Sequence, residues 1–122
     1  MAEQGKYDLA IEDYNSTIQL SGSEDKEVEA FAYNNRGFAF YKTGNTQAAL
    51  KDINHSIELF PGNSYAFKNR AIIYLEMKEK NKACIDLEKS IQLGYTEKYG
   101  SEVIKLQKDN CNLSLSRLVK IR

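Results

Sequence analysis

The side chains that most often carry catalysis are scarce in this sequence. One histidine, His55, and two cysteines, Cys84 and Cys111, stand among its 122 residues. A metal site needs several histidine, cysteine or carboxylate ligands that converge on one point, and this set is too scattered to predict one. His55 lies off the apolar face of its predicted helix, so we expect it at the surface. Neither a glycine-rich phosphate loop nor a Gly-x-Ser-x-Gly turn occurs.

Carboxylates occur in neighbouring pairs, such as Glu12-Asp13 and Glu24-Asp25. Adjacent residues on a helix point apart, so we expect these groups to be solvated rather than to act as an acid and a base on one substrate. The sequence therefore gives no basis for an enzyme, and it predicts no cofactor.

Two arginines and two aspartates recur at a fixed interval. Arg36 precedes Asp52 by the same number of residues as Arg70 precedes Asp86. We hypothesise that each arginine pairs with an aspartate on a neighbouring helix, either the one that follows it or the equivalent one before it. The preceding candidates are Asp13 for Arg36 and Asp52 for Arg70. Such pairs are structural, and they contribute little where they are exposed to water.

An internal repeat positions these residues. Residues 33–41 align with residues 67–75, each 34 positions further on, and the register continues to Leu59 and Leu93. Residues 5–20 fit the second half of the unit with an offset of 39. Within each unit, apolar residues three and four apart indicate amphipathic helices.

We predict six helices and two clear breaks between them. The breaks are Gly44-Asn45 and the run from Pro61 to Ser64, where a left-handed cap, an N-cap and a proline favour helix ends. A further helix begins after Gly94, with Thr96 as its N-cap. The predicted helices lie near residues 6–20, 26–43, 46–60, 64–78, 80–93 and 97–109.

A period of 34 residues built from two helices resembles the tetratricopeptide repeat (TPR), over about residues 5–93. That family has an aromatic residue, a small residue four positions later and a second aromatic three further on in its first helix. Both units have them: Tyr33, Gly37 and Phe40, then Phe67, Ala71 and Tyr74. The resemblance implies an all-α fold, a right-handed α-α solenoid of about two and a half repeats with a C-terminal capping helix. These six residues should form its stacking core.

The resemblance also implies the domain organisation. Residues 1–111 form a single TPR domain, which contains a half repeat (5–20), two repeats (30–63 and 64–95) and a capping helix (97–109). A tail follows at 112–122. We expect Tyr99, Val103 and Leu106 of the capping helix to cover helix 80–93.

The half repeat lacks its first helix, which leaves an apolar flank at Leu9, Ile11, Tyr14 and Ile18 without a partner. A solenoid end normally carries a polar cap. Three explanations remain open: the chain is cut from a longer repeat protein, it forms a homodimer through this flank, or the helix is tolerated as an end cap. The tail at 112–122 either extends the last helix, lies in a groove, or covers the N-terminal helix of a second copy.

In TPR arrays the first helices line a concave groove that usually holds a peptide or a partner's helix, so the resemblance implies a protein or peptide ligand here. Asn35 and Asn69 are the strongest candidates, because an asparagine can both donate to and accept from a peptide backbone. Phe38 and Ile72 would supply apolar pockets, and Lys42 and Lys68 would attract acidic groups. The full predicted set is Phe31, Asn34, Asn35, Phe38, Lys42, Tyr65, Lys68, Asn69, Ile72 and Glu76.

Some TPR domains hold a partner's C-terminal carboxylate with lysine, asparagine and arginine side chains. Asn35 matches one asparagine of that arrangement. Tyr65 and Asn69 stand where its last lysine and arginine would be. We therefore do not expect this chain to be a receptor for chaperone tails.

Cys84 and Cys111 would become neighbours if the last helix folds back on helix 80–93. The surrounding residues resemble bacterial TPR proteins in which such a pair is common, and the alternative is two separate buried or half-buried thiols. A disulfide persists only in an oxidising compartment. No signal peptide is visible, which favours a cytoplasmic protein with reduced thiols, or a periplasmic one if the N-terminus is truncated.

The amino-acid composition excludes further classes of function. The 17 basic and 17 acidic residues cancel, with no dominant basic stripe, so nucleic acid is a poor partner. No apolar run approaches the length of a membrane span. Residues 1–61 carry a net negative charge and residues 62–122 a net positive charge. This difference either reflects a solvated surface of uneven composition or would steer head-to-tail association. We expect a non-catalytic protein-interaction module, with a self-associating segment of a larger scaffold as the alternative.

Overall fold

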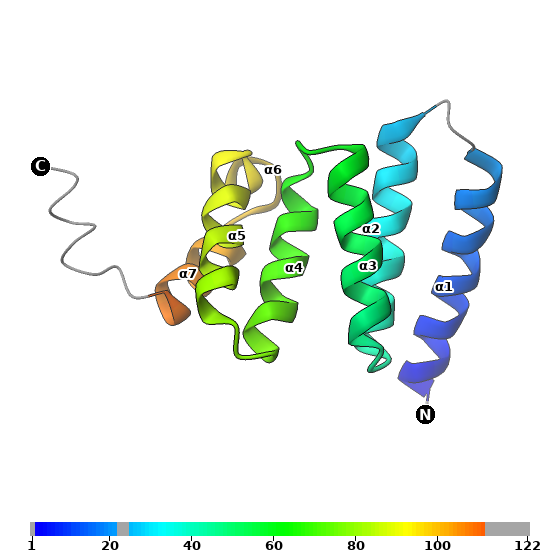
Figure 1. Cartoon of the computed structure of the whole chain (residues 1–122), viewed down its shortest axis with the longest axis horizontal. Coiled ribbons are helices and arrows are strands. Elements are labelled where there is room, and N and C mark those ends of the chain that lie inside the picture. The colour runs from blue at the N-terminus through cyan, green and yellow to red at the C-terminus, as the bar shows by residue number, and fades with distance from the viewer. Residues whose placement is uncertain (1, 22–24, 112–122) are drawn as a thin grey trace, which may run out of the picture.

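The computed structural model describes residues 2–21 and 25–111 of the chain. These residues form helices and no strand (Figure 1). In chain order the helices are α1 (Ala2–Ser21), α2 (Lys26–Lys42), α3 (Thr46–Leu59), α4 (Ser64–Glu76), α5 (Lys80–Gln92), α6 (Tyr95–Tyr99) and α7 (Glu102–Asn110).

Helix starts follow from polar caps in the sequence. The side chain of Asn45 accepts a hydrogen bond from the backbone N–H of Ala48 at 3.3 Å, which begins α3. Asn63 caps α4 in the same way, and Asp25 caps α2. Gly44 ends α2 with a φ of 89°, a backbone conformation that glycine adopts without steric cost. The breaks predicted at Gly44-Asn45 and before Ser64 are therefore confirmed.

The predicted capping helix at 97–109 is wrong in its boundaries. Two helices, α6 and α7, occupy this segment, and Gly100, with a φ of 105°, separates them. Thr96 is not an N-cap, because it lies inside α6 and its buried hydroxyl has no hydrogen-bond partner. Gly94, in the left-handed conformation, precedes α6 instead.

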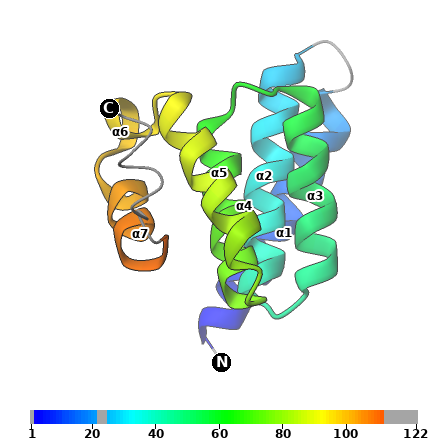
Figure 2. The ribbon, with the colours of Figure 1, turned by 60° about the vertical axis from the view of Figure 1, so that its left-hand side comes forward.

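The helices stack as antiparallel pairs, α2 with α3 and α4 with α5, and α1 packs on α2 (Figures 1 and 2). The same contact fastens both pairs. The hydroxyl of Ser56 donates to the carbonyl of Ala30 at 2.6 Å, and that of Ser90 donates to the carbonyl of Ser64 at 2.8 Å. The two contacts are one repeat apart. The fold is thus an all-α solenoid of helical repeats, as predicted.

The core lies between the helices of each pair and at the joint between pairs. One cluster contains Ala49, Ile53, Ala66 and Ile73, and a second contains Ala71, Ala83, Leu87, Tyr95, Val103 and Cys111. Of the six residues expected in the stacking core, Gly37, Phe67 and Ala71 are buried, while Tyr33, Phe40 and Tyr74 are only half-buried. The guanidinium group of Arg36 lies over the rings of Tyr33 and Phe40, and that of Arg70 lies over the ring of Tyr74.

The C-terminal helices cover α5 with fewer residues than expected. Val103 is fully buried and Leu106 is half-buried in the second cluster. Tyr99, however, is 48% exposed. Its ring meets that of Tyr65 edge-on, with centres 5.1 Å apart, and lies tilted against that of Tyr95 at 5.0 Å.

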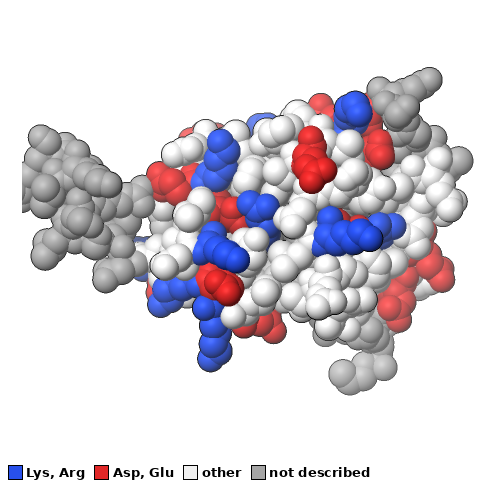
Figure 3. Space-filling model, in the orientation of Figure 1, with Lys and Arg blue, Asp and Glu red and all other residues white. Residues whose placement is uncertain are grey.

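The flank of α1 is less open than the sequence suggested. Leu9 is 65% exposed, whereas Ile11, Tyr14 and Ile18 are half-buried. The tail at 112–122 lies outside the described residues. Among the described helices, none combines the length and apolar character needed to cross a membrane. On the face shown in Figure 3, basic and acidic side chains are interspersed along the helices.

Candidate interaction groove

Two aspartate partners were considered for each arginine, and Arg36 and Arg70 both pair with the aspartate that follows in the chain. Arg36 donates to both carboxylate oxygens of Asp52 at 2.6 and 2.7 Å, and Arg70 does the same to Asp86 at 2.7 and 2.8 Å. The preceding helix contributes an asparagine instead: Asn15 accepts from Arg36 Nη1 and Asn54 from Arg70 Nη1. The hydrogen bond with aspartate raises the pKa of each arginine. Each arginine thus links three successive helices.

One cavity of about 240 Å³ opens between α1, α2 and α4, and we call it the inner cavity. Four of the ten residues predicted to line a groove line this cavity. They lie on α2 and α4 at helical spacings of three and four, which places them on one face. The complete lining is Lys6, Tyr7, Ala10, Tyr14, Asn35, Phe38, Ala39, Tyr65 and Asn69.

Two predicted groove asparagines bond to each other. Asn69 Nδ2 donates to Asn34 Oδ1 at 3.0 Å, and each residue is 1% exposed. Asn34 is therefore a link between α2 and α4 rather than a side chain open to a ligand, which corrects the prediction for it. Asn69 also lines the inner cavity, and its Oδ1 atom is buried without a hydrogen-bond partner. Asn35, by contrast, is exposed as expected.

Lys42 and Lys68 both approach the same ring. Each Nζ is 5.5 Å from the centre of Phe38, and Lys68 Nζ is also 4.3 Å from the centre of Tyr65. Lys68 is only 4% exposed, and Glu102 Oε1 lies 3.6 Å from its Nζ. Burial lowers the pKa of Lys68, and the charge of Lys42 lowers it further, against the opposing effect of Glu102. Burial of Lys68 departs from its expected position in an open groove.

The other predicted residues lie away from the inner cavity. Phe31 packs edge-on against Phe60, with ring centres 6.3 Å apart. Glu76 accepts a hydrogen bond from the Tyr41 hydroxyl. Burial and that hydrogen bond raise the pKa of Tyr41 to about 12. Ile72 is half-buried and is not part of the lining.

Sequence reasoning missed the wall that α1 contributes. Lys6, Tyr7 and Ala10 had no predicted role in binding, and Tyr14 was assigned to an unpartnered flank. Tyr7, Ala10 and Tyr14 are three and four residues apart, which places them on one helical face. That spacing was the available signal, but the pattern within one helix does not reveal which neighbour its face will meet.

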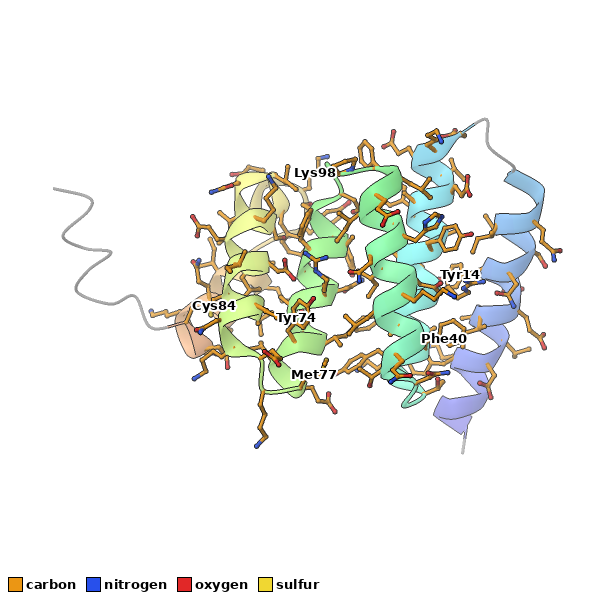
Figure 4. All side chains as sticks on the ribbon, in the orientation of Figure 1. Tyr14, Phe40, Tyr74, Met77, Cys84 and Lys98 are labelled. Carbon is orange, nitrogen blue, oxygen red and sulfur yellow. A yellow bond between two sulfur atoms is a disulfide. The ribbon has the colours of Figure 1, made fainter. Side chains whose placement is uncertain are left out.

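Cys84 and Cys111 form a disulfide with their Cα atoms 5.7 Å apart, which joins α5 to the end of α7. Cys84 lies on α5 beside α7 (Figure 4). The side chain of His55 is 43% exposed, in keeping with a surface position, and its ring packs edge-on against Tyr33 with ring centres 4.4 Å apart. Within the described ranges, no three metal-binding side chains come together.

Comparison with known proteins identifies the repeat. The family model of the tetratricopeptide repeat matches residues 30–63. The chain contains a tetratricopeptide repeat. Such repeats generally mediate contacts between proteins, and the family is generally non-catalytic.

Two mammalian proteins are similar to most of the chain. Sperm-associated antigen 1 of Mus musculus is 33% identical over 89 residues, or 73% of this chain. The Homo sapiens protein of the same name is 29% identical over 87 residues, or 71%. The chain spans 9% of the length of each. These relatives do not support the bacterial kind of repeat that the cysteine pattern suggested.

Proposed function

We propose that this chain is a non-catalytic protein-interaction module that holds a segment of a partner protein in the inner cavity. The observation that supports it is the convergence of two polar and two aromatic side chains, Asn35, Asn69, Phe38 and Tyr65, on the lining of one cavity.

The size of the inner cavity fits one side chain of a peptide. Its volume of about 240 Å³ is below the roughly 300–1,000 Å³ that is typical of small-molecule sites. Tyr7, Tyr14, Phe38 and Tyr65 provide apolar walls, and Asn35 stands exposed where a peptide backbone would leave the cavity. This arrangement supports an extended peptide with one large side chain inserted.

The test is selection of ligands from a random-sequence peptide display library, followed by affinity measurements on two matched variants. Asn35→Ala removes an exposed asparagine at the inner cavity, and Asn81→Ala removes an exposed asparagine on α5. We expect Asn35→Ala to weaken enriched peptides about threefold to tenfold, the value of one hydrogen bond, and Asn81→Ala to leave them unchanged. A failure to enrich any peptide, or equal affinity for both variants, would overturn the proposal.

Self-association as a segment of a larger scaffold is the second candidate, and the exposed Leu9 favours it. Leu9→Lys would abolish a dimer that forms through α1. A protein that is already monomeric before this substitution would exclude that interface.

A further inference from the structure

The disulfide between Cys84 and Cys111 lies beside open space on the side of α5 that carries the exposed Ile85. Cys84 is half-buried and lines a cavity of about 410 Å³, which we call the outer cavity. The rest of its described lining also comes from α5: Ile85, Glu88, Lys89 and Gln92. Cys111 is only 8% exposed, so a thiol would approach the bond at Cys84. Accessible disulfides exchange with thiols more readily than enclosed ones.

The same bond belongs to a packed cluster that extends to the inner cavity. Cys111, Tyr95 and Val103 are buried in one hydrophobic cluster. Cys84 and Tyr65 pack against this cluster. Tyr65 also lines the inner cavity. The disulfide and one wall of the inner cavity are therefore parts of one packed unit, which α4, α5, α6 and α7 form together.

Helix α7 adds an electrostatic contact to this wall. Glu102, the first residue of α7, accepts a hydrogen bond from the Tyr95 hydroxyl at 2.9 Å, and its Oε1 atom lies 3.6 Å from Lys68 Nζ. Lys68 Nζ in turn lies 4.3 Å from the centre of the Tyr65 ring. Lys68 is buried, and a buried ammonium group that loses its counter-charge is strongly destabilised. Departure of Glu102 would therefore move Lys68 toward water and away from the ring.

The disulfide decides how firmly α7 stays on α5. A helix of nine residues has little stability in isolation. Val103 and the hydrogen bond from Gln107 to Glu88, at 2.8 Å, contribute to its hold on α5. Cys111 ends α7, so the closed disulfide fixes that end of the helix to Cys84. Opening of the bond shifts the balance toward release of α7.

We propose that this disulfide is a site of exchange with a dithiol, and that its reduction weakens ligand binding in the inner cavity. A thiolate of the dithiol attacks Cys84 Sγ and forms a mixed disulfide, while Cys111 leaves as a thiolate and takes up a proton. The second thiol then displaces Cys84, so the dithiol becomes a disulfide and both cysteines become thiols. Helix α7 detaches, Glu102 leaves Lys68, and the wall at Tyr65 loosens. This inference rests on the proposed function, because it describes the regulation of the same site.

The first measurement needs no ligand. Amide chemical shifts of the full chain are compared with and without dithiothreitol. We expect changes throughout α6 and α7 and also at Tyr65 and Lys68, while α3 keeps its native signals. Unchanged signals at Tyr65 and Lys68 would show that α7 is not coupled to the inner cavity, and loss of native signals throughout the chain would make the disulfide purely structural. Either result would overturn the inference.

The second measurement titrates cysteine-free peptides, enriched on the oxidised chain, against the oxidised and the reduced chain. We expect reduction to weaken binding about tenfold, a typical size for coupling between two sites. The double variant Cys84→Ser, Cys111→Ser should bind like the reduced chain and should not respond to dithiothreitol. In the oxidised chain, Glu102→Ala should weaken binding. Asp109→Ala, which removes an exposed carboxylate near the other end of α7, should not.

The outcomes separate this inference from the proposed function. Equal affinities of the oxidised and reduced chain for peptides that still depend on Asn35 would overturn the inference and leave the proposed function standing. Equal affinities of Glu102→Ala and Asp109→Ala would likewise overturn the coupling through α7. Failure to enrich any peptide would overturn both.

Discussion

At the scale of single residues, the close approach of α2 and α3 depends on Gly37, which has no side chain. A Cβ atom on Gly37 would lie 2.7 Å from Ile53 Cγ1 and 2.9 Å from the carbonyl oxygen of Ala49. Both distances are shorter than packed atoms tolerate, and the second involves backbone that cannot turn aside. Ala71 occupies the equivalent place in the next repeat, so the α4–α5 pair accommodates the methyl group that the α2–α3 pair excludes.

Gly37→Ala should therefore destabilise the protein. Overpacking costs about 1–3 kcal/mol, and the better helix propensity of alanine returns about 1 kcal/mol. We expect a net loss of about 1 kcal/mol in urea denaturation. Gly5→Ala in α1 is the control, since nothing lies within 4 Å of its Cβ position, and it should be neutral or stabilising. Equal stability of Gly37→Ala and the unmodified protein would show that the two helices separate readily.

The hydroxyl of Tyr41 makes the free energy of unfolding depend on pH in the alkaline range. Its pKa rises from about 10 in the unfolded chain to about 12 in the folded one, so the folded chain keeps a proton that the unfolded chain loses between these values. The stability contributed by this hydroxyl is complete below pH 10 and disappears as the pH approaches 12. Urea denaturation at pH 9 and pH 11.5 should show a smaller loss in Tyr41→Phe than in the unmodified protein. Identical losses would assign the pH dependence to other groups.

At the scale of elements, the packing of α7 against α5 depends on the disulfide between Cys84 and Cys111. α7 has nine residues, and Val103, the hydrogen bond from Gln107 to Glu88 and the disulfide hold it against α5. A helix this short has little stability of its own. The disulfide closes a loop with a sequence separation of 27 residues.

Reduction of this disulfide should lower stability by about 3 kcal/mol, because the unfolded chain regains the freedom of the loop. Thermal unfolding with and without dithiothreitol measures the effect, and hydrogen exchange should locate the loosening in α7 before α3. The double variant Cys84→Ser, Cys111→Ser should melt like the reduced protein and ignore dithiothreitol. An unchanged melting temperature on reduction would mean that packing alone holds α7.

Local signals predicted most of the elements, and the limits of those signals explain the errors. Gly44 and Asn45 act within their own turn, so sequence suffices to place them. The break at Gly100 lies beyond the repeat, where no second unit fixes the register. The burial of Asn69 depends on Asn34 from another helix, which helical geometry alone does not reveal. The wall from α1 was missed because it forms only when α1 meets α2 and α4.

At the scale of the whole molecule, the described surface argues for a monomer. Its exposed large apolar residues are spread over different parts of the fold: Leu9, Val28, Met77, Ile85, Tyr99 and Ile104. Single apolar residues are ordinary on protein surfaces, whereas a stable interface buries a contiguous patch. Light scattering over a dilution series should give the monomer mass of 13.9 kDa in both low and high salt. A dimer that dissociates in high salt would instead point to head-to-tail pairing of the acidic and basic halves.

The proposed binding site is tested by mapping amide chemical shifts while the protein is titrated with the peptide most strongly enriched from the display library. We predict that the largest changes fall on the residues of α1, α2 and α4 that line the inner cavity, with Asn35, Phe38 and Asn69 among them. The outer side of α5 around Ile85 should stay unchanged. Changes concentrated around Ile85, with the lining of the inner cavity unaffected, would contradict it.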